Sequence, residues 1–461
     1  MNRNLVLGST RELGTVALVA GMCGAYAAML VMLSTVLGTS SAATGTSGFG
    51  AVLGVVSTVF VLIALYVSAV VVVNAVDTVL AGRLGRIALL RLLGARGRSL
   101  RGAVMRGTGA VAASGALAGV AAGTAGAWAF RVVLVEHHVI RRLDYPVVSP
   151  WLLAPLASIV LMSLAAGWVG SRSVLRVSPA AALAGQIADE PRRTSRRRTA
   201  VAVTLILGGA GALVLAAVLG ESGDLGGFVL AFLGSATSAT GLLVGARLVI
   251  PRAVASVGHA WGGAPVARIA RRNAVKDPRR TTRSTMGLVI GATLVTTFAS
   301  GLQALRLSVD SWQLSATRRD EAVSVLSTMT TILVVVAVVS AVISAVGFVS
   351  TMSMTVIQRE REIGLLRTLG FTRRQVRTMI AQESAALSGS AVLLGVVLGL
   401  VYGSVGAQAL IGSQTSGFVW GVPWRVLAAI AVGAVALVLV AALPPARRAV
   451  RVTPIEALRI W

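Results

Sequence analysis

The sequence predicts an all-α polytopic membrane protein, and three observations lead to this prediction. Hydrophobic residues make up 56% of the 461-residue chain, whereas charged residues make up only 13%. Apolar runs of about 20 residues recur, and a helix of that length crosses the hydrocarbon core of a bilayer. A backbone in lipid must satisfy its own hydrogen bonds, so each run is expected to be helical. We therefore expect about ten transmembrane helices.

The ten predicted spans follow one another along the whole chain. In order they are residues 13–37, 51–75, 105–129, 150–170, 199–220, 226–249, 284–305, 328–352, 383–410 and 424–443. With a cytoplasmic N-terminus, most of the 42 Lys and Arg residues fall on the cytoplasmic side. Those left outside are Arg131, Arg141, Arg142, Arg306, Arg318, Arg319 and Arg425. This asymmetry predicts that both termini are cytoplasmic, in a bacterial cell (plasma) membrane.

The positive charge could indicate either nucleic-acid binding or the orientation of a membrane protein, and its position along the chain distinguishes the two. The formal net charge is +26, a value that nucleic-acid-binding proteins also reach. Here the positive residues gather in the inner connecting segments, where they orient the protein and meet anionic inner-leaflet lipids. We expect a lipid bilayer as the partner of this charge, and no nucleic acid.

An internal repeat runs through the chain. RIALLRLLGARGRSLR (86–101) aligns with EIGLLRTLGFTRRQVR (362–377) at an offset of 276 residues, and both contain the order LLRxLG. RVSPAAAL (176–183) and RVTPIEAL (451–458) end the two copies. Each copy would hold four spans that begin inside and carry a basic segment between the second and third span.

The repeat defines predicted domains and predicted packing positions. The domains are 1–185, a first four-span module, 186–250, a basic linker with two connecting spans, and 251–461, a second four-span module. The GxxxG pairs of the third span in each module put two glycines on one helix face, where backbones can approach closely. These packing positions are Gly119, Gly123, Gly395 and Gly399.

The segment after the eighth span is amphipathic and interrupted. Gly370 is suited to end one short helix, and Thr372 is suited to cap another that begins at Arg373. One reading is a surface helix whose arginines bind anionic headgroups. The other is a docking element for a cytoplasmic partner. The repeated LLRxLG core favours docking, because lipid adhesion requires basic residues but no fixed leucine order.

Three stretches of the chain resemble a known family. QREREIGLLRTLGFTRRQV (358–376), ARIARRNAVKDPRRTTRSTMGL (267–288) and RVTPIEALR (451–459) are similar to the signature of FtsX-like (MacB-type) permeases of ABC transporters. The ten spans with two modules look like the bacitracin-transporter-type arrangement. The resemblance implies a permease subunit, working in export or mechanotransmission, that couples ATP hydrolysis by a separate cytoplasmic ABC-type ATPase to movement of its membrane or extracytoplasmic part.

The resemblance also implies where the ATPase is contacted. In this family the contact lies between the second and third spans of a module, which covers both copies of the LLRxLG segment. In the second module the candidate docking residues are Arg359, Glu360, Glu362, Ile363, Leu365, Leu366, Arg367, Leu369, Gly370 and Phe371. In the first they are Ile87, Leu89, Leu90, Arg91, Leu93 and Gly94. We expect a homodimer or a pseudo-dimer built from the two modules.

One departure from the family pattern is visible. Relatives often carry a sizeable extracytoplasmic domain between the first two spans of a module, whereas the corresponding loops here are 38–50 and 306–327. The longer loop fits either a short helical stalk or an ordinary polar connection.

Other function classes have little support. A P-loop requires Gly-Lys-Ser/Thr, but the sole lysine, Lys276, follows a valine, so nucleotide must be handled by a partner chain. An ion-coupled secondary transporter, the main alternative beside a non-transporting membrane scaffold, would bury ionisable residues at mid-membrane. Asp77, Arg106 and Glu383 lie near predicted cytoplasmic ends instead.

A membrane-embedded enzyme also has little support. The loop after the third span holds Glu136, His137, His138 and Asp144. Adjacent histidines rarely bind one metal ion without further ligands, so we expect no metal site. We expect no cofactor and no catalytic residue in this chain.

Overall fold

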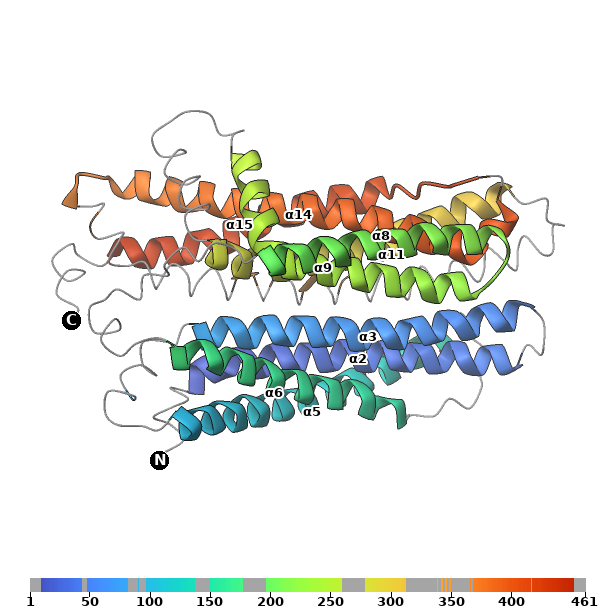
Figure 1. Ribbon diagram of the computed structural model, residues 1–461, viewed down its shortest axis with the longest axis horizontal. Helices are drawn as coiled ribbons and strands as arrows, with labels where there is room; N and C mark the ends of the chain where they lie inside the picture. Colours follow the sequence, from blue (N-terminus) through green and yellow to red (C-terminus); the bar gives the residue numbers. More distant parts are fainter. Residues whose placement is uncertain are drawn as a thin grey trace. The chain divides into compact units, whose positions relative to one another are not determined.

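The computed structural model describes most of the chain. The described residues are 10–43, 48–81, 90, 97–136, 150–176, 196–258, 278–311, 338, 341–342, 345, 348–349, 365, 368–415 and 417–451. They form α2 (Thr10–Ala43), α3 (Gly48–Ala81), α5 (Gly97–Glu136), α6 (Leu153–Arg176), α8 (Arg196–Glu221), α9 (Gly226–Gly258), α11 (Pro278–Ser311), α14 (Arg373–Ile411) and α15 (Trp424–Arg451), with 3-10 turns at Pro150–Leu152 and Gly412–Gln414. No strand occurs in these ranges. The predicted all-α fold is confirmed (Figure 1).

The predicted spans coincide with these helices. Seven helices of the described part are long and apolar enough to cross a membrane. Two more, α2 and α15, carry the shorter apolar stretches Val16–Met32 and Trp424–Leu439. The predicted span 328–352 lies almost wholly outside the described residues. The prediction of a polytopic helical membrane protein is therefore confirmed, while the total of about ten spans stays a prediction.

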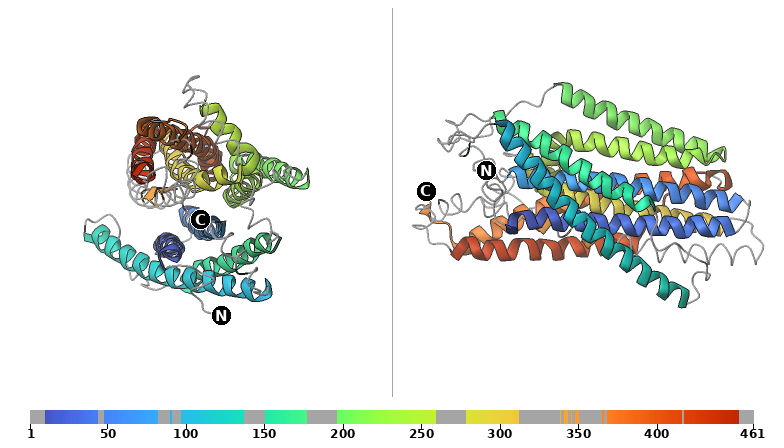
Figure 2. Two further views of the ribbon diagram at one scale, coloured as in Figure 1. Left: turned by 90° about the vertical axis from the view of Figure 1, so that its left-hand side faces the viewer. Right: turned by 90° about the horizontal axis from the view of Figure 1, so that it is seen from below.

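The chain forms two compact units. The first comprises residues 1–195 with 320–339, and the second comprises 196–319 with 340–461. In the first unit α2 packs against α5 and α3, and α6 packs against both α3 and α5. Buried Val16, Ala20, Cys23 and Val76 belong to its core. Figure 2 shows α5 crossing α2 obliquely, so that only part of α5 is covered.

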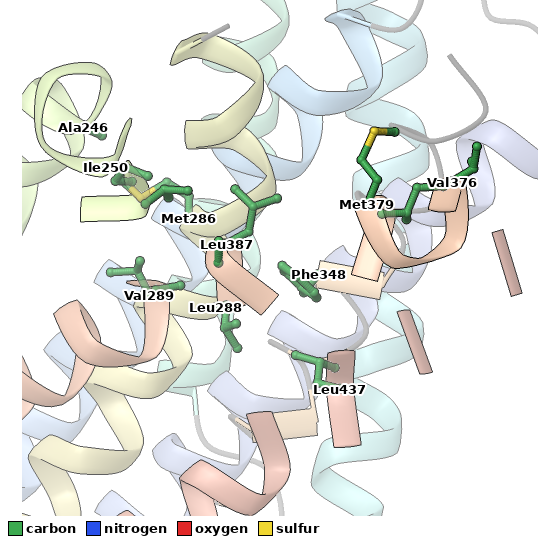
Figure 3. Close-up of a cluster of buried hydrophobic side chains, with 14 residues drawn as sticks. Ala246, Ile250, Met286, Leu288, Val289, Phe348, Val376, Met379, Leu387 and Leu437 are labelled. Carbon is green, nitrogen blue, oxygen red and sulfur yellow. The ribbon is translucent and has the colours of Figure 1, made fainter. Parts of the chain in front are cut away.

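The second unit is arranged around α14. This helix packs against α8, α9, α11 and α15. In its first four turns Val376, Met379 and Leu387 join a buried apolar cluster with residues of α9, α11 and α15. Figure 3 shows these three side chains together with Phe348, which belongs to the same cluster. The cluster fixes the N-terminal part of α14 within the second unit.

The connecting helices α8 and α9 are part of the second unit. They lie side by side as a hairpin (Figures 1 and 2), and both pack on α14. The buried hydroxyls of Ser238 on α9 and Tyr402 on α14 are 2.6 Å apart. A Cβ on Gly220 of α8 would meet the Cα of Ala409 at 2.5 Å, so the backbones are close. The predicted domain boundaries at 185 and 250 stay predictions.

Candidate functional site

The predicted docking segment 359–371 ends in one described helical turn. The backbone N–H of Leu369 donates to the carbonyl oxygen of Leu365 at 3.1 Å. Gly370 then adopts φ +93°, in the left-handed region that glycine occupies without strain. The backbone therefore stops being helical at Gly370, as predicted from the sequence.

Thr372 restarts the helix through a reciprocal cap. Its backbone N–H donates to Gln375 Oε1 at 2.9 Å, and the N–H of Gln375 donates to Thr372 Oγ1 at 3.3 Å. This capping box satisfies two backbone donors that the first turn of a helix leaves unpaired. α14 begins at Arg373, and the predicted cap is confirmed.

Three apolar side chains of this turn point to different surroundings. Leu365 is 54% exposed and Leu369 is 71% exposed, and their four-residue spacing places them on one helix face. Phe371 is partly buried and packs against the apolar cluster of α14. The turn thus fastens itself to the second unit through Phe371 and presents two leucines outward.

The other predicted docking residues are only partly described. In the first module Leu90 is partly buried and packs against the core of the first unit. Outside the described residues lie Ile87, Leu89, Arg91, Leu93, Gly94, Arg359, Glu360, Glu362, Ile363, Leu366 and Arg367. Their role in docking stays a prediction.

Positive charge surrounds the N-terminal ends of α5 and α14. Arg373, Arg374 and Arg377 are exposed on the first turns of α14. In the first unit the guanidinium carbon of Arg101 lies 5.9 Å from the ring centroid of Trp168, within the range of a cation–π contact. These residues suit phosphate or carboxylate partners at the membrane surface.

The packing glycines all lie at helix crossings. A Cβ on Gly119 would overlap the backbone of Gly21, and one on Gly123 would lie 2.6 Å from the Cα of Ala25. On α14 a Cβ at Gly395 would lie 2.6 Å from the Cβ of Ala292, and Gly399 faces Thr296 equally closely. Sequence reasoning proposed close packing here but not the partner helices, which are α2 and α11.

Glu383 is one of three ionisable residues that the sequence analysis places near the end of a predicted span. It lies on α14, 5% exposed, and it is not without an interaction partner. In the described ranges no three His, Cys, Asp or Glu side chains gather in a way that could hold a metal ion. His137, His138 and Asp144 lie outside those ranges, and Glu136 is exposed.

Comparison with known proteins gives the class of the molecule. The family described as FtsX-like permease C-terminal matches residues 58–179 and again 334–454, together more than half of the chain. The two matches begin 276 residues apart (334 minus 58), which is the offset of the internal repeat. The chain belongs to the FtsX-like permease family.

Three curated relatives align with shorter parts of the chain. The uncharacterized ABC transporter permease YknZ of Bacillus subtilis is 33% identical over 135 residues, 29% of this chain and 32% of its own length. The uncharacterized ABC transporter permease MJ1507 of Methanocaldococcus jannaschii is 29% identical over 140 residues, 30% of this chain and 34% of its own length.

The third relative is named as both an ATP-binding protein and a permease. The pyoverdine export ATP-binding/permease protein PvdT of Pseudomonas syringae is 30% identical over 168 residues, 36% of this chain and 24% of its own length. The aligned parts therefore span about a third of the first two relatives and about a quarter of the third.

Proposed function

We propose that this chain is the permease subunit of an ABC transporter, and that its segment 359–371 binds a separate cytoplasmic ATPase. The exposed pair Leu365 and Leu369, held on a capped turn at the start of α14, is the observation on which the proposal rests. Membership of the FtsX-like permease family supports it, as do two relatives named ABC transporter permeases.

The proposed site has the properties of a small docking surface. Exposing two large apolar side chains to water is unfavourable. Burying one leucine fully in a contact with a partner stabilises the complex by about 1.5–3 kcal/mol. Exposed Arg373, Arg374 and Arg377 follow directly in the chain. They would give the rim a positive charge and favour a partner surface with acidic residues.

The same turn would pass movement into the membrane. Phe371 packs into the core of the second unit, and the capping box joins the turn directly to the first residues of α14. A displacement of Leu365 and Leu369 by the ATPase would therefore move α14, because no flexible linker separates them. We infer export or mechanotransmission as the output of this coupling.

The proposed orientation follows from the docking site. The ATPase and its nucleotide are cytoplasmic, so the turn at 365–372 and both chain termini would face the cytoplasm of a bacterial cell. The turn between α14 and α15 would then face outward. The excess of Lys and Arg in the inner segments supports this arrangement.

A co-purification experiment tests the docking site. The tagged chain is purified from its native membranes, and we expect a cytoplasmic P-loop ATPase to be retained. Replacing both leucines (Leu365→Asp and Leu369→Asp) should reduce the retained ATPase about tenfold or more, because two charges would enter an apolar contact. The conservative pair Leu365→Met and Leu369→Met should retain it.

A charge control separates docking from a general effect of acid residues. Thr378 is exposed on α14 about two turns beyond the proposed segment, so Thr378→Asp adds an acidic residue nearby without touching the leucine pair. Equal retention of the ATPase by the double Asp variant and by wild type, with unchanged ATP hydrolysis, would show that this turn is not the docking site.

A further inference from the structure

One end of the α8–α9 hairpin carries all the arginines of these two helices. They are Arg196, Arg197 and Arg198 at the start of α8 and Arg247 and Arg252 in the last half of α9. Neither helix has an acidic residue at this end, since the acidic residue of α8, Glu221, is its last. Ile250 and Val254 of α9 belong to the buried cluster that also contains Val376 of α14. The arginines therefore lie at the end of the second unit where α14 begins.

Two of these arginines are held on one side of α9. Arg198 Nε donates to the carbonyl oxygen of Val244 at 2.9 Å, and Arg252 Nη1 donates to the carbonyl oxygen of Leu248 at 2.7 Å. Val244 and Leu248 are four residues apart, so their carbonyl groups lie about one helical turn apart on the same side of the helix. Two guanidinium groups, one from each helix, are thereby anchored close together, and each has further N–H donors that these bonds do not use.

This pair of positive groups suits a phosphate. Like charges so close together repel each other, and more strongly where the surroundings exclude water. Arg198 is part-buried at its contact with α9, and Arg252 is exposed. The planar guanidinium group can donate two parallel hydrogen bonds to a phosphate. One phosphate between the two groups would therefore replace their repulsion by two attractive contacts.

Exposed apolar residues extend from this pair along the hairpin. On α8, Arg197, Val201 and Leu215 share one helix face, because they are separated by four and then fourteen residues, and all three are exposed. On α9, Leu233 is exposed and shares a face with Val244, which follows it by eleven residues. An exposed apolar face of a membrane-spanning helix contacts acyl chains. The hairpin thus offers an apolar surface that ends at paired guanidinium groups.

We propose that Arg198 and Arg252 bind the phosphate of one anionic phospholipid, whose acyl chains lie along the exposed apolar surface of the hairpin. A phospholipid fits because its phosphate and its apolar chains are joined, as the guanidinium pair and the apolar surface are joined here. A free phosphate or an acidic peptide would use only the charge. Arg196 and Arg197 would add attraction for negative charge at the membrane surface. This lipid occupies one fixed place, unlike the diffuse layer of anionic lipids that any basic surface attracts.

Lipid titration of the purified chain tests the site. The chain is delipidated in mild detergent and titrated with phosphatidylglycerol, with neutral phosphatidylcholine or with inorganic phosphate, and native mass spectrometry counts the bound lipids. We expect one phosphatidylglycerol to be retained about tenfold more tightly than phosphatidylcholine, whose choline neutralises the phosphate. Phosphatidylglycerol should also raise the unfolding temperature, since a ligand of the folded state stabilises that state. Inorganic phosphate at the same concentration should do neither.

Arginine variants locate the lipid. Arg198→Gln with Arg252→Gln should weaken phosphatidylglycerol binding about tenfold or more, because both charged donor groups are lost. Arg252 is exposed and its bond lies within its own helix, so Arg252→Gln alone leaves the packing intact and should still weaken binding. Arg198→Lys with Arg252→Lys keeps the charge but removes the planar donor groups, so it should weaken binding as well.

The matched control removes the same charge from α5. Arg98 and Arg106 are exposed there, and Arg106 Nε donates to the carbonyl oxygen of Gly102 in its own helix at 3.3 Å. Arg98→Gln with Arg106→Gln should leave phosphatidylglycerol binding within about twofold of wild type, because this pair is not anchored on a neighbouring helix.

Other outcomes overturn the proposal. An equal loss of binding in the α5 control and in the α8–α9 variants would show that general surface charge attracts the lipid. Equal stabilisation by inorganic phosphate would identify a free-anion site, and unchanged binding by the lysine variants would remove the role of guanidinium geometry. None of these residues belongs to the docking turn, so failure here would leave the ATPase-docking proposal unaffected.

Discussion

The two units pack their central helix pairs with the same geometry but with different chemistry. In the first unit Gly115, Gly119 and Gly123 of α5 meet Ala17, Gly21 and Ala25 of α2, and every residue in both rows is small and apolar. In the second unit three glycines of α14, Gly395, Gly399 and Gly403, also lie against a partner helix, α11. The α11 residues that they contact include four with hydroxyl groups: Thr293, Thr296, Thr297 and Ser300.

Among these hydroxyls, Ser300 adds directional contacts to α14 that the glycine and alanine rows of the first unit have no side chains to make, whereas Thr293 and Thr297 donate to carbonyl oxygens of their own helix. Ser300 Oγ lies 3.1 Å from Ser404 Oγ, and Ser404 Oγ also accepts the backbone N–H of Gly421 at 3.2 Å. The second pair is therefore held in register by shape and by hydrogen bonds, and the turn before α15 is fastened to it. The difference teaches that glycine alone suffices for close approach, while the Ser404 hydroxyl of α14 connects the helix pair to the loop before α15.

The largest expected effect comes from a methyl group at the tightest crossing. Gly119→Ala would place a Cβ inside the backbone of Gly21, where no side chain can move aside, and should lower the free energy of unfolding by about 3 kcal/mol or more. Gly399→Ala should cost less, about 1–3 kcal/mol, since the overlap is smaller: the added Cβ would lie 2.5 Å from the Thr296 Cβ and 2.7 Å from the Thr293 carbonyl oxygen. The unfolding temperature in detergent measures these effects, and the reaction of buried Cys23 with a thiol-reactive dye reports separately whether Gly119→Ala opens the first unit.

An unhindered glycine provides the control. A Cβ added to Gly211 on α8 would meet no atom of another element within 4 Å, so Gly211→Ala should leave the unfolding temperature nearly unchanged or raise it slightly. If Gly119→Ala behaved like Gly211→Ala, the close crossing of α2 and α5 would be wrong.

Removing one hydroxyl tests the polar half of the comparison. Ser404→Ala should lower the stability of the second unit by about 1–2 kcal/mol, because the buried N–H of Gly421 loses its acceptor as Ser300 loses a partner. Hydrogen exchange at Gly421 should become faster. Ser390→Ala serves as the control, since Ser390 donates to the carbonyl of Leu387 within its own helix. Unchanged exchange at Gly421 would contradict the fastening of the turn.

The smallest effect is expected where α9 joins α14. Tyr402→Phe removes the hydroxyl that lies 2.6 Å from Ser238, and hydrogen bonds between membrane helices average about 0.6 kcal/mol. A double-mutant cycle with Ser238→Ala should give a coupling energy of that size. A coupling energy of zero would mean that this hydroxyl pair does not help to hold α9 against α14.

Much of the local structure could be predicted from the sequence. The positions of the helices follow from apolar length, and the stop at Gly370 and the cap at Thr372 follow from residues within four positions of one another. Such signals are short-range, so tertiary contacts rarely override them. GxxxG spacing likewise indicates that another helix packs closely against the glycine face, and the glycines of α5 and α14 do lie where two helices cross.

The partners of these surfaces could not be predicted. The glycine spacing on α14 does not predict that threonine and serine of α11 contact these glycines, because the contact joins residues about a hundred positions apart. The family resemblance also groups Phe371 with Leu365 and Leu369 as candidate docking residues. The structure turns Phe371 toward its own core and leaves the two leucines exposed, a division that depends on the position of the neighbouring helices.

The length of α14 has a mechanical consequence. Its 39 residues run without interruption from the capped turn to the opposite end of the second unit. At 1.5 Å per residue this is a rigid arm of about 58 Å, nearly twice the ~30 Å thickness of the hydrocarbon core. Tilting such an arm by about 5° about one end moves the other end by about 5 Å, by simple trigonometry on that length. A small tilt of α14 at the capped turn would thus reach Ile411, its last residue, as an amplified displacement.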